Sequence, residues 1–242
     1  DIIHCNDWQT ALIPLLIKIK EQEGDAYFTK RKLKSILTIH NMAYQGIFPR
    51  EKLSTAENLR QYFTSHFEFY GKVNLLKAGI IACDLLMTVS PRYEDEIQTK
   101  EFGCGLDGVV RCHQKKLRAI LNGLDYDLWN PQTDKDIHVR YSFRNVNKKK
   151  EENKRVLQKS FNLPMDNLTP IFGFVGRLSY QKGVELLMGS MPELAKRPCQ
   201  VVIQGQGSGD YKRKLLKLSS DFSSKLGVSF EFDDNLARSI YA

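Results

Sequence analysis

The sequence has little of what marks a disulfide scaffold, a metal centre or a membrane span. Its five cysteines are widely scattered and form no C-x-x-C pair, which favours free thiols in a reducing compartment. The longest apolar runs, such as ALIPLLI, fall far short of the roughly 20 residues that a membrane-spanning helix needs. No charged leader precedes an apolar targeting segment, and the cluster from His4 to Asp7 is too isolated to predict a metal site. We therefore expect no membrane association, no metal site and a reducing compartment such as the cytoplasm.

Positive charge is what the sequence has in excess. Lys and Arg number 36 against 28 Asp and Glu, which gives a formal net charge of +8 over 242 residues. Such a balance favours anionic partners, among them phosphorylated small molecules, nucleic acid and acidic surfaces. Tyrosine and phenylalanine do not alternate with the basic residues as a nucleic-acid stacking surface requires, so we expect no nucleic-acid partner.

Short β-branched runs alternate with stretches whose apolar residues recur every three or four positions. This alternation is typical of an α/β fold in which helices cover both faces of parallel sheets, here as two Rossmann-like domains. The predicted strands cover residues 1–5, 34–41, 85–90, 116–123, 171–176, 200–205 and 228–232. The predicted helices cover residues 6–20, 72–84, 91–98, 151–161, 183–196, 210–222 and 234–242. Ser90 followed by Pro91 is a typical helix start.

The composition changes after the predicted strand that ends in LNG. Residues 124–153 are polar and include the lysine run 148–150, before a helical pattern resumes. We interpret the change as a boundary between a domain of residues 1–122 and a domain of residues 123–242. A long surface loop within one domain is the alternative.

Two cations stand out where the strand at 171–176 ends. Arg177 follows that strand directly, and Lys182 precedes the next predicted helix. Ligands of parallel sheets bind at the carboxyl ends of the strands, and a planar guanidinium with a mobile ammonium suits a diphosphate. Solvated surface cations would show the same spacing, so spacing alone leaves both interpretations open.

Several longer motifs resemble the glycogen and starch synthases. They are DIIHCNDWQTALIP, LTIHNMAYQGIF, EFGCGLDG, NGLDYDLWNP, FGFVGRLSYQKG and VVIQGQGSGD. The resemblance implies a GT-B architecture, in which two Rossmann-like domains face each other across a cleft. It further implies a retaining glucosyltransferase that uses a nucleotide sugar, ADP-glucose rather than UDP-glucose, to extend glycogen or another α-1,4-glucan. A related transferase with another donor or acceptor, or a non-catalytic glycan-binding protein, is the alternative.

The resemblance also assigns roles to particular positions. Residues 1–122 would form part of the acceptor-side domain, and residues 123–242 part of the nucleotide-sugar domain. The implied catalytic residues are Arg177 and Lys182 on the donor phosphates, His40 on the transferred glucose and Asp7 near the acceptor. The implied substrate-binding residues are Asn122, Gln181, Asn41, Tyr44, Gly205 and Gly207. For the two glycines a simple tight turn explains the spacing equally well. The resemblance implies no cofactor and no metal, and it implies a cytoplasmic location, or a plastid in a plant or alga.

Other groups fit catalysis less well. The carboxylates at 94–96 lie on a predicted helix, where we expect them to form a solvated face. Asp125 and Asp127 lie in a predicted turn, where an Asp side chain commonly bonds its own backbone. Cys104 has no evident histidine partner.

The sequence departs from the family in two respects. Asn6 stands where relatives commonly carry a histidine. The chain also begins inside an apolar run and ends inside a helical pattern, so we expect a fragment of each domain that is inactive by itself.

Overall fold

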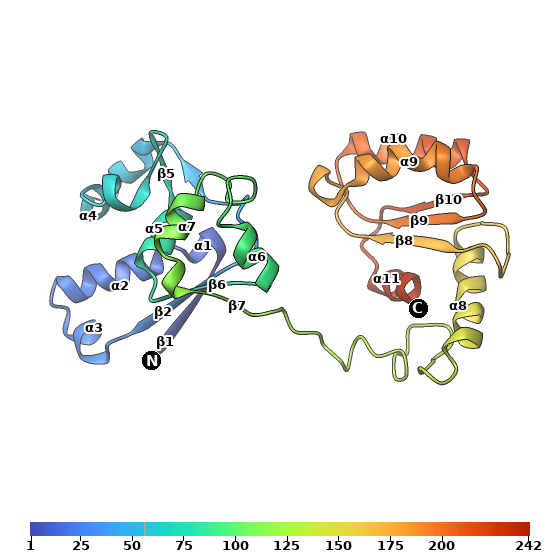
Figure 1. Cartoon of the computed structure of the whole chain (residues 1–242), viewed down its shortest axis with the longest axis horizontal. Helices are drawn as coiled ribbons and strands as arrows, with labels where there is room; N and C mark the ends of the chain where they lie inside the picture. Colours follow the sequence, from blue (N-terminus) through green and yellow to red (C-terminus); the bar gives the residue numbers. More distant parts are fainter. Residues whose placement is uncertain (56) are drawn as a thin grey trace. The chain divides into compact units, whose positions relative to one another are not determined.

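The computed structural model describes residues 1–55 and 57–242, and the chain divides into two compact units (Figure 1). Unit 1 comprises Asp1–Gly123 and unit 2 comprises Leu124–Ala242. Each unit contains a parallel sheet and its own buried apolar clusters, so each has a separate core. Among the described residues, no helix is long and apolar enough to cross a membrane.

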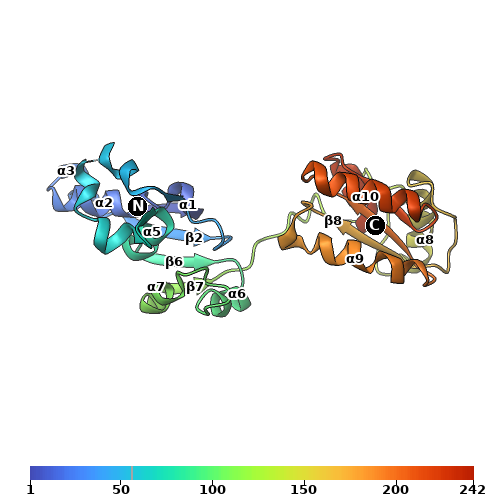
Figure 2. The ribbon, with the colours of Figure 1, turned by 90° about the horizontal axis from the view of Figure 1, so that it is seen from above.

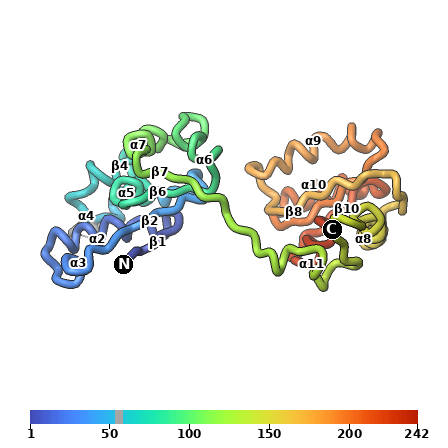
Figure 3. Tube along the Cα trace, turned by 60° about the horizontal axis from the view of Figure 1, so that its bottom comes forward, coloured from blue at the N-terminus to red at the C-terminus, as the bar shows by residue number. Residues whose placement is uncertain are grey.

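The main sheet of unit 1 has four parallel strands in the order β1-β2-β6-β7. They are β1 (Ile2–Asn6), β2 (Lys34–Ile39), β6 (Leu85–Thr88) and β7 (Leu117–Ala119). One row of register partners crosses all four strands, and each side chain in it is at most 1% exposed: Cys5, Leu37, Leu86 and Leu117. The strand β7 is shorter than the predicted strand 116–123. In Figure 3 the trace leaves β1, passes through the helices that follow it and returns to β2, which pairs with β1 in parallel.

Helices lie on both sides of this sheet. They are α1 (Asp7–Thr10), α2 (Ile13–Gln22), α3 (Ala26–Arg31), α4 (Glu57–Arg60), α5 (Leu75–Ala82), α6 (Pro91–Glu96) and α7 (Asp107–Cys112), with the short η1 (Arg50–Thr55), η2 (Phe63–Phe67) and η3 (Gln114–Lys116). Figure 2 shows α1 and α2 on one side of β2 and β6, and α6 and α7 on the other. The predicted helix 6–20 is two helices instead, and Pro14 lies in the first turn of α2, where its missing N–H is tolerated.

A small antiparallel sheet in unit 1 has no counterpart in the prediction. Its strands, in the order β3-β5-β4, are β3 (Ile47–Phe48), β5 (Lys72–Asn74) and β4 (Glu68–Phe69). The predicted helix 72–84 is therefore wrong over its first three residues. The reason is local, because the Asn74 side chain accepts a hydrogen bond from the Lys77 amide at 2.9 Å and so caps α5. The predicted start of α6 is confirmed, since Ser90 Oγ accepts from the Tyr93 amide at 3.0 Å.

The sheet of unit 2 has three parallel strands in the order β10-β9-β8. They are β8 (Ile171–Val175), β9 (Gln200–Gln204) and β10 (Leu226–Ser229). The surrounding helices are α8 (Val146–Ser160), η4 (Tyr180–Lys182), α9 (Val184–Ala195), α10 (Gly209–Asp221) and α11 (Asp234–Tyr241). Figure 1 shows α9 and α10 over one face of the sheet and α11 on the other.

Glycines on the outer strands let the helices approach the middle strand. Val202 of β9 is fully buried, with Gly173 and Gly227 as its partners on either side. A Cβ at Gly173 would lie 2.5 Å from Ile240 of α11, and one at Gly227 would lie 2.5 Å from Phe161. The two glycines therefore make room for the side chains that cover Val202.

The predicted start of α8 and both predicted ends of β10 are wrong. The lysine run 148–150 belongs to α8, where it precedes the buried Asn153 and Leu157 in the same helix, rather than to a polar connecting segment. The strand β10 ends at Ser229, so residues 230–232 form a loop instead of the end of a strand. Ser229 is the last residue in register with β9, and its carbonyl oxygen accepts from the Gly205 amide at 3.0 Å.

The polar segment 124–145 packs against α8 and α11 of unit 2. Arg238 of α11 pairs with Asp134 at 3.3 Å and with Asp136 at 2.5 Å, and the Arg238 side chain is 13% exposed. Asn153 of α8 bonds both the N–H and the C=O of Val139, at 2.8 and 2.9 Å. Side-chain contacts to buried groups therefore hold this segment in place without regular secondary structure.

Candidate functional site

In unit 1, Asp7 and His40 lie together at the carboxyl ends of neighbouring strands. Asp7 follows β1 and His40 follows β2, and the Asp7 Oδ1 accepts a hydrogen bond from the His40 amide at 2.8 Å. Asp7 has φ of +54°, a left-handed conformation that costs a non-glycine residue free energy. Strained backbone at the carboxyl edge of a parallel sheet is typical of a functional position.

The imidazole of His40 is oriented by Asn6. The distance from His40 Nε2 to Asn6 Oδ1 is 3.0 Å, and because an amide oxygen only accepts, this contact is a hydrogen bond in the ring tautomer that carries its proton on Nε2. The Nδ1 atom is then left as an acceptor for a ligand hydroxyl. Asn6 thus makes a specific polar contact with the ring of His40.

The loop after His40 is fixed by the side chains of Tyr93 and Asn74 and by the backbone of Cys104. The Tyr93 hydroxyl accepts from the Met42 amide at 2.8 Å, and burial raises the pKa of Tyr93, so this hydroxyl keeps its proton. The buried Gln45 donates from Nε2 to the carbonyl oxygens of Met42 and Cys104, both at 3.0 Å, and accepts from Asn74 at 2.6 Å. The Gln45 bond to Cys104 ties this loop to the glycine-rich segment 101–108.

The remaining predicted residues of unit 1 lie in or beyond this region. Asn41 accepts from the Ala43 amide at 3.0 Å, which makes a tight turn, and Tyr44 is 50% exposed. Asn122 follows β7, two strands away from β2 in the sheet order; it is exposed and makes no hydrogen bond within the described part of the chain. The structure thus brings Asp7, His40 and Asn41 together but does not place Asn122 in contact with them.

In unit 2, a pocket of about 440 Å³ opens where the three strands end. Its walls come from the ends of β8 and β9, from the loop after β10 and from the start of α11: Val175, Gly176, Arg177, Gln204, Gly205, Gln206, Glu231, Phe232, Asp233, Asp234 and Ala237. Arg177 is exposed, and it forms no hydrogen bond or ion pair with any described residue. An unpaired guanidinium at the mouth of such a pocket is available to an anionic ligand.

The glycines at 205 and 207 allow two loops to touch through their backbones. A Cβ at Gly205 would lie 1.8 Å from the Gly176 carbonyl oxygen, and one at Gly207 would lie 2.6 Å from Leu178 Cβ. Leu178 also donates its amide to the Gln206 carbonyl at 2.7 Å. The glycine spacing therefore has a packing cause, and the contact places Gly205 in the wall of the pocket beside Arg177.

Lys182 and Gln181 lie on η4, after Arg177 in the chain. Both are exposed, and neither lines the pocket that contains Arg177. Lys182 forms no ion pair within the described residues. Gly183, with φ of +72°, ends η4 and starts α9 directly behind it.

Sequence reasoning missed the pocket residues that follow β10. Glu231 and Phe232 were assigned to a strand, whereas the structure places them in the pocket wall. Phe232 is 82% exposed, which is unusual for a large apolar side chain and is typical of a ligand-stacking surface. The run EFDD ahead of a helix is a sequence signal for a helix N-cap rather than for a continuing strand. In the structure Asp233 is that N-cap, and it accepts from the Asn235 and Leu236 amides at 2.8 and 3.1 Å.

The competing groups are engaged elsewhere. Glu96 pairs with Arg92 at 3.0 Å on the surface of α6. Asp125 accepts from the Asp127 and Leu128 amides, both at 3.0 Å, which confirms the predicted Asp turn. Burial raises the pKa of Cys104, which disfavours the thiolate that a nucleophile needs. Within the described residues, no three His, Cys, Asp or Glu side chains are grouped so that they could hold a metal ion.

Comparison with known proteins places the chain among related sequences. Residues 1–112 match the family described as the starch synthase catalytic domain. Glycogen synthase of Thermodesulfovibrio yellowstonii is 42% identical over 243 residues, which cover 100% of this chain and 48% of the relative. Glycogen synthase of Thermosipho melanesiensis is 44% identical over 244 residues, with coverage of 100% and 50%. The chain therefore spans about half the length of the curated relatives it matches.

A solved structure has a similar fold. The catalytic domain of Starch Synthase IV from Arabidopsis thaliana, bound to ADP and acarbose, has a TM-score of 0.87 and 30% identity. The alignment covers 100% of this chain and 50% of that chain. This likeness confirms the predicted α/β fold class with Rossmann-like units of the GT-B type.

Proposed function

This chain belongs to the family of glycogen and starch synthases, and from that membership we propose that the protein containing it is a retaining glucosyltransferase. It would transfer glucose from ADP-glucose to the non-reducing end of an α-1,4-glucan. The substrates are thus a nucleotide sugar and a glucan, with neither nucleic acid nor membrane as a partner, and the location is the cytoplasm.

The observation that carries this proposal is the unpaired Arg177 at the pocket of unit 2. The leaving group of the reaction is a nucleoside diphosphate, which gains negative charge as the glycosidic bond breaks. A guanidinium binds two phosphate oxygens at once, and Lys182 five residues later offers a second, mobile charge. ADP in the solved starch synthase supports a nucleoside diphosphate as the ligand of this pocket.

The remaining walls of the pocket suit the nucleoside. The exposed ring of Phe232 offers a face on which a base can stack. The carboxylates of Glu231 and Asp234 are acceptors for ribose hydroxyls. Carboxylates would repel the diphosphate, so we place the phosphates nearer Arg177 and the ribose nearer Glu231.

In unit 1, the groups around His40 suit the sugar. Neutral imidazole and amide groups fix hydroxyls without competing for the charge that develops on the glucosyl carbon. His40 Nδ1 would accept a hydrogen bond from a glucose hydroxyl. Asp7 and Asn41, at the same edge of the unit 1 sheet, would contact the acceptor glucan.

We further propose that the reaction needs no metal, because Arg177 and Lys182 can neutralise the departing diphosphate. Retention would then follow from attack on the same face of the glucose, with the leaving phosphate taking the proton of the acceptor hydroxyl.

The test uses the full-length protein that contains this chain. Radiolabelled ADP-glucose and UDP-glucose are each offered with glycogen, with and without a chelator, and the anomeric configuration of the product is determined. We expect transfer from ADP-glucose with retention and no effect of the chelator. Binding of glycogen without transfer would favour the glycan-binding alternative, and transfer only from another sugar nucleotide would favour a related transferase.

A further inference from the structure

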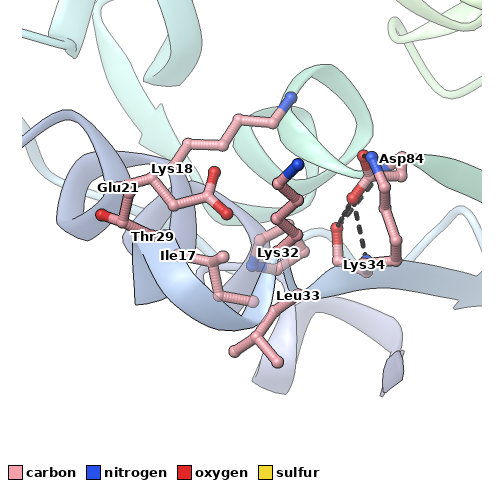
Figure 4. A pocket seen from close by; sticks show the side chains of 10 residues that line it. Ile17, Lys18, Glu21, Thr29, Lys32, Leu33, Lys34 and Asp84 are labelled. Carbon is pink, nitrogen blue, oxygen red and sulfur yellow. Dashed lines mark hydrogen bonds and ion pairs between the residues drawn. The ribbon is translucent and has the colours of Figure 1, made fainter. Parts of the chain in front are cut away.

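A second pocket opens at the opposite edge of the unit 1 sheet from Asp7 and His40. It lies at the amino ends of β2 and β6 and has a volume of about 340 Å³, within the range of small-molecule sites, roughly 300–1,000 Å³. Its lining residues come from α2, α3, β2 and the turn before β6: Pro14, Ile17, Lys18, Glu21, Thr29, Lys32, Leu33, Lys34, Ser35 and Asp84. We call it the lysine pocket (Figure 4).

One of its two carboxylates is already satisfied. Asp84 Oδ2 accepts from the Ser35 amide at 2.8 Å and from the Ser35 hydroxyl at 2.9 Å, and Asp84 Oδ1 pairs with Lys34 at 3.1 Å. Although burial opposes it, these bonds lower the pKa of Asp84, so the carboxylate stays ionised and engaged. Asp84 therefore neutralises the charge of Lys34 and does not pair with the other cations of the lysine pocket.

Lys18 and Lys32 are those other cations, and neither forms a hydrogen bond or ion pair with the described residues. Lys18 lies on α2, three positions before Glu21 and on the same face of the helix. Figure 4 shows the ammonium ends of Lys18 and Lys32 extending toward the same side of the lysine pocket, with the Glu21 carboxylate also facing it.

Lys32 is held there at a cost. It ends α3 with φ of +48°, the left-handed position at which helices usually carry glycine. Its amide donates to the Phe28 carbonyl at 3.2 Å, a bond that a glycine would make equally well. A glycine would therefore fit this backbone conformation with less strain than the lysine does.

We propose that the lysine pocket binds a small phosphorylated polyol, with the phosphate between Lys18 and Lys32 and the hydroxyl groups on Glu21. A phosphate monoester is close to a dianion at neutral pH, so it matches two ammonium groups. The free carboxylate of Glu21 accepts from hydroxyls, which inorganic phosphate lacks. The lysine pocket and the pocket proposed for the nucleoside diphosphate are different pockets, in different units of the chain.

Calorimetric titration of the full-length protein that contains this chain tests the proposal with three probes: glycerol 3-phosphate, inorganic phosphate and glycerol. We expect glycerol 3-phosphate to bind tightest, phosphate to bind weaker and glycerol not to bind. Equal affinity for glycerol 3-phosphate and phosphate would overturn the role of Glu21. Absence of heat with both anions at millimolar concentration would overturn the site.

Three variants separate binding from folding. Lys32→Gly removes the ammonium and relieves the left-handed backbone, so we expect an unchanged or higher unfolding temperature together with at least tenfold weaker binding of glycerol 3-phosphate. Glu21→Gln should abolish the preference for glycerol 3-phosphate over phosphate. Lys30→Gln, on the exposed surface of α3, is the matched control and should bind as the unaltered chain does. Unweakened binding by Lys32→Gly, or equal weakening by Lys30→Gln, would show only nonspecific attraction to positive charge.

Discussion

Replacing Arg177 by alanine separates ligand binding from folding in unit 2. The side chain is exposed and has no partner in the described structure, so its loss should change the free energy of unfolding by less than about 0.5 kcal/mol. A hydrogen-bonded pair between a guanidinium and a phosphate contributes about 1.5–3 kcal/mol. With a factor of ten for each 1.4 kcal/mol, the dissociation constant for ADP should rise about 10- to 150-fold.

The assay is calorimetric titration of ADP into the full-length protein and its Arg177→Ala variant, with urea unfolding of both. Arg213→Ala is the matched control, because Arg213 is an exposed arginine on α10 that pairs with Asp210 at 3.3 Å and does not line the pocket. The reasoning fails if ADP binds Arg177→Ala within twofold of the unaltered protein, or if Arg213→Ala loses as much affinity. A large loss of stability in Arg177→Ala would show that the guanidinium has a structural role instead.

Three further perturbations follow from the geometry. Gly205→Ala puts a Cβ 1.8 Å from a backbone carbonyl oxygen of the neighbouring loop, so the free energy of unfolding in urea should fall by about 1–3 kcal/mol. Gly189→Ala is the control, because no atom lies within 4 Å of its added Cβ, and it should leave the stability unchanged or raise it. Arg238→Met removes one partner of a buried ion pair and should destabilise unit 2 by roughly 3–5 kcal/mol; a loss under 1 kcal/mol would contradict that burial. The folded-state pKa of Asp84 is lowered, against burial, by Ser35 and a lysine, so its stabilisation is present above about pH 4 and is lost as the pH falls through the folded value. The free energy of unfolding of Asp84→Asn should therefore depend less on pH below about pH 4 than that of the unaltered protein. The same pH dependence in both proteins would refute this.

The sequence predicted most elements of the fold because their signals are local. Ser90 and Pro91 start α6 as expected, since a side-chain cap and a proline at the first turn act within a few residues. The helical pattern at 72–84 hid the short strand β5, because Asn74 both ends that strand and caps the helix. No local signal marks such a strand, as its partners β3 and β4 are themselves only two residues long.

For the pocket of unit 2, the sequence pointed to the ends of two of the strands that line it and assigned one of its walls to a strand. Arg177 and Gly205 were expected near a donor ligand, and the structure places both in one pocket. Phe232 was missed, because the apolar alternation of VSFEF favours a strand while the register with β9 ends at Ser229. Only the pairing of one strand with its neighbour determines where the strand stops and the loop begins.

The sequence by itself determined the α/β class, the family resemblance and the types of residue at each strand end, because periodicity and motif spacing are properties of the chain alone. Tertiary structure alone decided which of those residues meet. The contact of Asn6 with His40 spans 34 positions, and the lysine pocket joins α2, α3 and β2 with Asp84, which is 49 positions from Ser35. Such groupings depend on strand order and on helices packing over the sheet, and no local pattern carries that information.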